Sequence, residues 1–181
     1  MEEVECSHTH PGRRQPAQVR PPCGHGNLWV GTGRGGLNRF HDGRLTQYTT
    51  RDGLPDNAIR NLFEDRAGNL WIGTESGRLG RFKDGRFTTW VISDAVKGNP
   101  VVSFFEDHVG NLWVGTIDGG LGRFKDGQFA GITAKDGLYD NVAFQMLADA
   151  EDDSANLWIS CNKGIYRVSL KELNDFADGR I

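Results

Sequence analysis

The chain has 181 residues, of which 21 are lysine or arginine and 24 are aspartate or glutamate, so its formal net charge is −3 at pH 7. This balance excludes the strongly basic surface that nucleic-acid-binding domains use. No apolar run approaches the ~18 residues of a membrane-spanning helix, and the 25 glycines are roughly twice the average usage. The composition therefore predicts a turn-rich β protein with no nucleic-acid partner and no membrane segment in this chain.

Residues 1–26 share nothing with the rest of the chain and show no hydrophobic periodicity. Their prolines and scattered charges are typical of a disordered arm, and they lack the apolar centre of a secretory signal peptide. The cysteines and histidines of this arm have shorter spacings than the usual structural zinc pairs. We therefore predict that the arm binds no metal and that the chain has no cofactor; the residues concerned are Cys6, His8, His10, Cys23 and His25.

A short sequence recurs four times along the rest of the chain. It reads NLWVGT at 27–32, NLWIGT at 69–74, NLWVGT at 111–116 and NLWISC at 156–161. The first three copies are 42 residues apart and the last follows after 45. A fixed period in this range predicts a stack of supersecondary units, none of which can bury its apolar face alone.

One unit, at residues 57–98, is complete and has clear turn signals at its boundaries. It reads as four short strands, at residues 57–65, 70–74, 78–82 and 86–92. The dipeptide Asp84-Gly85 between the last two is typical of a type I′ hairpin turn, and it recurs at Asp42-Gly43 and Asp126-Gly127. Four antiparallel strands in about 42 residues predict the blade of a β-propeller.

The repeats divide the chain into blades at residues 27–56, 57–98, 99–140 and 141–168. We expect the first blade to lack its inner strand, because RPPCGHG at 20–26 replaces an apolar sequence, and the last blade to lack its outer strand. The predicted fold class is therefore all-β, a partial β-propeller of about 3.5 four-stranded antiparallel blades that forms part of a larger propeller.

The tail at residues 169–181 departs from the repeat pattern. Ser169 and Glu172 match a helix capping box, and Gly179 suits a C-terminal cap. We predict a short helical insert here, in the place where the last blade's outer strand is expected.

A tryptophan occupies the same repeat position in all four units, at Trp29, Trp71, Trp113 and Trp158. Each lies in mid-strand between apolar residues, which favours packing of one blade against the next over an exposed stacking platform for sugars. The end blades have a neighbour on one side only, so we expect self-association through their open edges. Apolar side chains of the Trp29 and Tyr48 rows should be exposed at one end, and those of the Trp158 row at the other.

The pattern of residues 59–82, I-x-x-L-F-E-D-x-x-G-N-L-W-I-G-T-x-x-G-x-L-x-R-F, resembles the two-component regulator propeller repeat. The Asp-Gly-Leu sequences at 52–54 and 136–138 fit that family too. The resemblance implies the sensor region of a bacterial hybrid histidine kinase or related regulator. Such a region has about seven blades, lies outside the inner membrane and recognises a signal that is often derived from a glycan. The remaining blades of a parent protein would then be partners of this chain.

Comparison of the repeats separates shared positions from positions that differ between blades. Only the differing positions can make an asymmetric binding site. The turns after Gly-Thr differ, and one position of the inner strand is polar in each blade. We predict that a small polar or glycan-derived ligand binds among these residues; the alternative is solvated turns around a water-filled channel. The predicted ligand-binding residues are Arg34, Glu75, Asp118, Lys163, Asn61, Ser103 and Gln145.

Catalytic residues are not apparent. The paired carboxylates at 64–65 and 106–107 recur at strand ends, which favours a role in turns over acid–base catalysis. No phosphate-binding loop, hydrolase elbow or kinase signature is present. We predict a non-catalytic sensor propeller without catalytic residues or metal ligands. A propeller lyase or hydrolase acting on glycans, and a pure protein-interaction module, stay open as alternatives, and the chain itself does not indicate its location.

Overall fold

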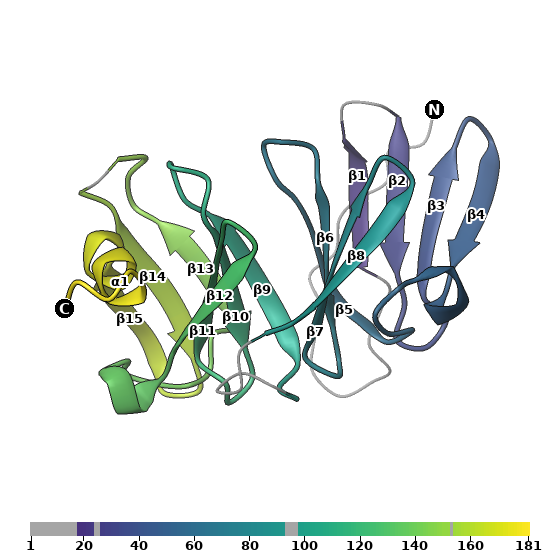
Figure 1. The fold of residues 1–181 in the computed structure, drawn as a ribbon. Helices are drawn as coiled ribbons and strands as arrows, with labels where there is room; N and C mark the ends of the chain where they lie inside the picture. The colour runs from purple at the N-terminus through teal and green to yellow at the C-terminus, as the bar shows by residue number, and fades with distance from the viewer. Residues whose placement is uncertain (1–17, 24–25, 93–97, 153) are drawn as a thin grey trace.

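The computed structural model describes residues 18–23, 26–92, 98–152 and 154–181. Within these ranges it contains 15 β-strands, two short 3-10 helices and one α-helix. The strands form four antiparallel sheets that fan out side by side in chain order (Figure 1). The prediction of an all-β, partial propeller is confirmed.

Each sheet is one blade, and its strands follow one another in chain order. Blade 1 contains β1 (Gln18–Cys23), β2 (Asn27–Gly31), β3 (Leu37–His41) and β4 (Arg44–Tyr48). Blade 2 contains β5 (Ile59–Glu64), β6 (Leu70–Thr74), β7 (Arg78–Lys83) and β8 (Arg86–Val91). Blade 3 contains β9 (Val101–Glu106), β10 (Leu112–Thr116), β11 (Leu121–Lys125) and β12 (Gln128–Ile132). Blade 4 contains β13 (Gln145–Ala148), β14 (Asn156–Cys161) and β15 (Gly164–Ser169), followed by α1 (Leu170–Ala177).

Blade 1 has four strands, which corrects the expectation that it begins at its second strand. β1 pairs antiparallel with β2, with Val19 opposite Val30. The register shifts between Arg20 and Cys23, where two consecutive prolines remove backbone donors. Strand pairing uses backbone groups, so this edge strand forms without the apolar pattern on which the expectation depended.

The rest of the predicted arm, residues 1–17 and 24–25, lies outside the described residues. The prediction that its cysteines and histidines bind no metal therefore stays a prediction. Among the residues that the structure does describe, no group of three His, Cys, Asp or Glu side chains is placed to hold a metal ion.

The Asp-Gly hairpins form as predicted. Asp42, Asp84 and Asp126 have φ angles of 48°, 49° and 50°, in the left-handed region that aspartate tolerates better than most residues. Each is followed by a glycine that also has a positive φ angle, which is the geometry of a type I′ turn. These turns join β3 to β4, β7 to β8 and β11 to β12.

Apolar cores lie between consecutive blades, as the repeated tryptophans predict. Trp29 meets Phe82 of the next blade with ring centroids 5.1 Å apart and an interplanar angle of 66°. Trp71 meets Phe124 at the same distance and angle. Trp29, Trp71 and Trp113 are all buried, so in the first three blades this position serves blade packing and does not offer a platform for sugars.

The third junction, between blades 3 and 4, is closed by α1. Leu170 and Leu173 are buried in the same core as Trp113, and Phe176 packs against it. The helix begins where Ser169 Oγ accepts a hydrogen bond from the Glu172 backbone N–H at 3.3 Å, which confirms the predicted N-terminal cap. In the described part of the chain blade 4 has three strands, and α1 supplies the apolar side chains that β8 and β12 supply in blades 2 and 3.

The open ends differ in part from the expectation. Trp29 is buried, because the tryptophan of each blade faces the following blade, and blade 2 covers it. The apolar side chains exposed at the blade 1 end are therefore Phe40 and Leu45, on the opposite face. At the other end Trp158 is exposed, as predicted, together with Leu147. No helix among the described residues is long and apolar enough to cross a membrane.

Candidate functional site

In blades 2, 3 and 4 an aspartate before the Asn-Leu-Trp motif holds the tryptophan in place. Asp65 accepts hydrogen bonds from the Asn69 backbone N–H at 2.8 Å, from Asn69 Nδ2 at 2.6 Å and from Trp71 Nε1 at 2.7 Å. Asp107 and Asp149 repeat these three bonds in blades 3 and 4. The interpretation of these carboxylates as turn residues is confirmed, since their oxygens accept bonds from the scaffold.

The arginine of the Arg-Phe motif is also part of the scaffold. Arg39 lies over the ring of Trp29 at 5.6 Å, and Arg81 lies over Trp71 at 5.8 Å, within the range of a cation–π contact. Both arginines stand directly opposite their tryptophan on the neighbouring strand. The residues shared by all blades are therefore engaged in contacts within and between blades.

The turns that differ between blades all lie at one edge of the molecule, which we call the turn edge. It contains residues 32–36, 75–77, 117–120 and 162–163. This edge also carries the 3-10 helices η1 (Thr50–Asp52) and η2 (Ala134–Asp136) (Figure 1). The Asp-Gly turns at 42–43, 84–85 and 126–127 form the opposite hairpin edge. Of the predicted ligand-binding residues, Arg34, Glu75, Asp118 and Lys163 lie at the turn edge.

Glu75 is joined to Arg60 of the same blade by a hydrogen-bonded ion pair. The Arg60 side chain lowers the pKa of Glu75 below its ordinary value, chiefly through the hydrogen bond. The carboxylate is therefore ionised at neutral pH, and its side chain is still about half exposed. Glu75 presents a fixed negative charge at the turn edge.

Lys163 lies beside two residues of the connection that enters blade 4. Its Nζ is 3.3 Å from a carboxylate oxygen of Asp140 and 5.5 Å from the centre of the Tyr139 ring. The pKa of Asp140 is lowered, first by the hydrogen bond from the Val142 backbone N–H and then by Lys163. These contacts orient the lysine while leaving it largely exposed.

Arg34 and Asp118 are exposed at the turn edge. Neither makes an ion pair with another of the residues that the structure describes. Asp118 has a φ angle of 68°, so the turn holds it in the left-handed conformation. A cation and an anion are thus available in the turns of blades 1 and 3.

The inner-strand positions have a different environment. Asn61 Nδ2 donates to the Val102 backbone oxygen at 2.6 Å, and Ser103 Oγ donates to the Ala143 backbone oxygen at 2.7 Å. Each of these side chains thereby connects its own blade to the next. Gln145, at the same repeat position in blade 4, is exposed. Asn61 and Ser103 use a donor for blade packing, which sequence comparison could not reveal.

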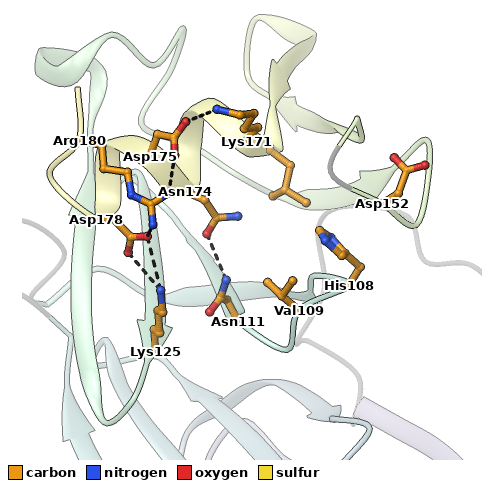
Figure 2. Close-up of a pocket in the computed structure, with 11 residues that line it drawn as sticks. His108, Val109, Asn111, Lys125, Asp152, Lys171, Asn174, Asp175, Asp178 and Arg180 are labelled. Carbon is orange, nitrogen blue, oxygen red and sulfur yellow. Dashed lines mark hydrogen bonds and ion pairs between the residues drawn. The ribbon is translucent and has the colours of Figure 1, made fainter.

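A pocket of about 420 Å³ lies between α1 and the turn that joins β9 to β10 (Figure 2). None of the seven predicted ligand-binding residues lines it. Charged side chains contribute much of its lining, with cations and carboxylates in near balance. The lining residues with ionisable side chains are His108, Lys125, Lys171, Arg180, Asp152, Asp175 and Asp178.

The carboxylates of this pocket are paired with neighbouring donors. Asp178 contacts the buried Arg123, and Lys125 at 3.3 Å; Arg123 and then Lys125 lower its pKa. Asp175 contacts Lys171 at 2.5 Å and Arg180 at 2.9 Å, and the pKa of its carboxyl is lowered in the same way. Carboxylates with lowered pKa values are weak proton acceptors. Asp178 therefore fastens the end of α1 to blade 3, and both carboxylates are poorly suited to acid–base catalysis.

Sequence reasoning missed this network. Arg123 belongs to the same repeat position as Arg39 and Arg81, which gave no reason to expect a different role. In the structure its guanidinium donates to the Asn174 backbone and side-chain oxygens at 3.1 Å and 2.9 Å. The partners are more than 50 residues apart in the chain, and α1 is not repeated, so no signal in the sequence linked them.

Comparison with protein families identifies the repeats. Residues 53–76 and 95–118 match the family model described as two component regulator propeller. These two segments are two-component regulator propeller repeats. Both matched segments end in the turn after Gly-Thr, at Ser76 and Asp118. The family model thus spans the inner strand, the Gly-Asn-Leu-Trp strand and the start of the variable turn in two consecutive blades.

Solved structures show the same fold at low sequence identity. Virginiamycin B lyase from Staphylococcus aureus is 17% identical with a TM-score of 0.61, and the match covers 87% of this chain and 56% of that one. PorZ, a surface component of the type-IX secretion system of Porphyromonas gingivalis, is 15% identical with a TM-score of 0.63, covering 84% and 25%. At these identities the likeness shows a shared fold and nothing of activity.

A third structure is the extracellular domain of a putative one-component system from B. thetaiotaomicron. It is 22% identical with a TM-score of 0.47, and the match covers 88% of this chain and 28% of that domain. The chain with two-component regulator propeller repeats thus spans about a quarter to just over half of these structures. The comparison with curated proteins gave no match.

Proposed function

We propose that this chain is a non-catalytic sensor propeller segment of a two-component regulator, and that a small polar or glycan-derived ligand binds at the turn edge. The observation that carries the proposal is that the shared and the variable repeat positions have different roles. The shared aspartate, asparagine, tryptophan and arginine side chains are engaged in blade structure, as Asp65 and Arg81 illustrate. The side chains that differ between blades carry charge and lie together at one edge.

The chemistry of the turn edge suits a ligand rich in hydroxyl groups. Arg34 and Lys163 are donors, whereas Glu75 and Asp118 are acceptors. Because Glu75 and Lys163 are oriented by ion pairs, they lose less conformational freedom when they bind. The family resemblance leads us to propose an extracytoplasmic location for this site.

Binding to a panel of defined oligosaccharides, measured by isothermal titration calorimetry, tests the proposal. Asp118→Asn removes the charge but keeps a side chain that tolerates the left-handed turn. We expect it to weaken binding of the best oligosaccharide about tenfold, the effect of one lost hydrogen bond to a charged group. Arg34→Ala should weaken binding to a similar extent.

Matched controls lie at the hairpin edge. Asp126 is exposed and has a φ angle of 50°, so Asp126→Asn makes the same chemical change in the same backbone conformation. Arg44→Ala is the control for Arg34→Ala, because Arg44 is an exposed arginine beside the hairpin of blade 1. Equal losses in the variants and their controls, or no binding to any oligosaccharide, would contradict the proposal.

A further inference from the structure

The outer face of blade 4 repeats the face that blades 1–3 use to bind the next blade. Register places Leu147 and Arg167 opposite Trp158, and Ile165 opposite Ser160. Cross-strand partners point to the same side of a sheet. Leu147, Trp158 and Ile165 therefore lie on one face, which we call the leading face.

The equivalent side chains in the other blades are covered. Trp113 and Leu121 of blade 3 stand at the positions of Trp158 and Ile165, and both are 0% exposed. In blade 4 Trp158 is 41% exposed, Ile165 is 71% exposed and Leu147 is 72% exposed. The difference arises because blades 1–3 are each followed by another blade, whereas in the described chain blade 4 is followed by α1 on its other side.

The first blade presents the complementary surface. Phe40 of blade 1 occupies the repeat position of Phe82 and Phe124, which contact Trp29 and Trp71 of the preceding blades. Phe40 has no preceding blade within the described chain and is 45% exposed. On the same face of blade 1, Leu45 is 70% exposed and stands at the repeat position of Phe87. We call this surface the trailing face.

We propose that the leading face of one copy binds the trailing face of a second copy of this chain, in the arrangement that joins consecutive blades within the chain. The two faces carry the residue types that already form two junctions of this kind. In this contact the Trp158 ring packs against Phe40 of the second copy in an edge-to-face arrangement, as Trp29 packs against Phe82. A second copy suits the leading face, because its trailing face carries Phe40 and Leu45 at the repeat positions of Phe82 and Phe87, which pack at the first junction.

The contact is heterologous, since different faces of the two copies meet. Such contacts form a closed ring or an open chain, depending on the rotation between copies. Two copies joined at both junctions contain eight blades, and eight lies within the range of about 4–8 blades that propellers use. Gln145 lies on the leading face at the position where Asn61 and Ser103 donate to the next blade, so it is placed to donate to the second copy.

Two variants with opposite defects test the proposal by analytical ultracentrifugation. Ile165→Glu places an unpaired charge on the leading face, and Phe40→Glu places one on the trailing face. Burial of an uncompensated charge should weaken association at least about 100-fold in either variant. The wild-type chain should associate as its concentration rises, and each variant alone should be a monomer.

A mixture of the two variants provides the decisive test of whether the two faces bind each other. Each retains one intact face, so the mixture should form 1:1 dimers and nothing larger. Val91→Glu is the matched control, because Val91 is a 57% exposed apolar residue in blade 2, away from both end faces, and it should associate like the wild type. The formation of dimers in the mixture also shows that both variants are folded.

Several outcomes would overturn the proposal. A wild-type chain that is monomeric at all concentrations would show that the proposed contact does not form. Continued association of either variant alone would indicate a contact between identical faces. A mixture that stays monomeric while both variants show the wild-type circular dichroism spectrum would show that the two faces do not bind each other.

Discussion

At the scale of single residues, the repeats assign most polar side chains to structure. In blades 2, 3 and 4 the aspartate before the Asn-Leu-Trp motif accepts the indole N–H of the tryptophan. This explains why aspartate and tryptophan recur six residues apart in blades 2 and 3 and nine residues apart in blade 4. In blade 1 the corresponding position is Cys23, and Asn27 Oδ1 accepts instead from Arg39 Nε at 2.7 Å.

Asp107 and Asp149 provide a test of this role, because they make the same bonds at different depths. Asp107 is fully buried and Asp149 is exposed. Asp107→Ala leaves buried donors of Asn111 and Trp113 without their acceptor, so we expect it to lower the free energy of unfolding by about 2–4 kcal/mol. Asp149→Ala should lower it much less, because water can replace the exposed carboxylate as an acceptor. Urea denaturation of both variants measures the difference, and equal losses would mean that the carboxylate does not act through burial.

The candidate site shows how far residue-level prediction from the sequence can go. Repeat comparison found the turn positions that differ, and the structure groups Arg34, Glu75 and Asp118 at one edge. Comparison of the repeats does not show that Asn61 and Ser103 donate to the next blade, because these hydrogen bonds depend on the spacing between blades. That spacing is a tertiary property, which a repeat pattern does not encode.

At the scale of elements, local signals decided most of the fold. The four strands of blade 2 were predicted to within two residues, because apolar periodicity and the Asp84-Gly85 turn define them. β1 was missed, because an edge strand pairs through backbone groups that leave no apolar pattern. The position of α1 was also missed, although its start at Ser169 was predicted, because its docking depends on Arg123 and other residues far away in the chain.

The role of α1 in closing the third junction can be measured through its buried face. Leu173 is 4% exposed and packs in the core that contains Trp113. Leu173→Ala should lower the free energy of unfolding by about 2–4 kcal/mol, the usual range for a buried leucine. Lys171→Ala is the control on the exposed side of the same helix; it removes only an exposed ion pair with Asp175 within the helix, so it should change stability far less than Leu173→Ala. Similar small effects in both variants would mean that α1 does not pack on blade 3.

Acid should release the same helix. The pKa values of Asp175 and Asp178 are lowered in the folded protein, chiefly by hydrogen bonds from Lys171 and Arg123 respectively. A carboxyl with a lowered folded-state pKa stabilises the fold above its unfolded pKa, about 3.9 for aspartate, and loses this contribution as the pH falls through the folded value. The melting temperature should therefore fall below about pH 4, and it should fall less steeply in Asp178→Asn. An identical pH profile in the variant would show that Asp178 does not contribute.

At the scale of the whole molecule, one packing rule explains both the cores and the open ends. Every blade offers a tryptophan to the blade that follows and an apolar position, Phe in blades 1–3 and Val168 in blade 4, to the blade that precedes. The interior junctions satisfy the rule within the chain. The leading face with Trp158 and the trailing face with Phe40 have no neighbouring blade within the described residues, which is why they are more exposed than their equivalents.

The two edges of the propeller differ in the roles of their residues. The hairpin edge contains the shared Asp-Gly turns. The charged side chains of the pocket beside α1 hold the helix in place. The turn edge contains the residues that vary. If the chain is a sensor, ligand binding should change the amide exchange of the turn edge and leave that of the hairpin edge unchanged.

Hydrogen–deuterium exchange of the chain with and without the oligosaccharide that binds most tightly tests this claim most directly. We predict slower exchange in the turns at 32–36, 75–77 and 117–120 when the oligosaccharide is bound. Exchange at the Asp-Gly hairpins 42–43, 84–85 and 126–127 should not change. Protection confined to the hairpin edge or to the pocket beside α1 would contradict ligand binding at the turn edge, as would a panel in which no oligosaccharide binds.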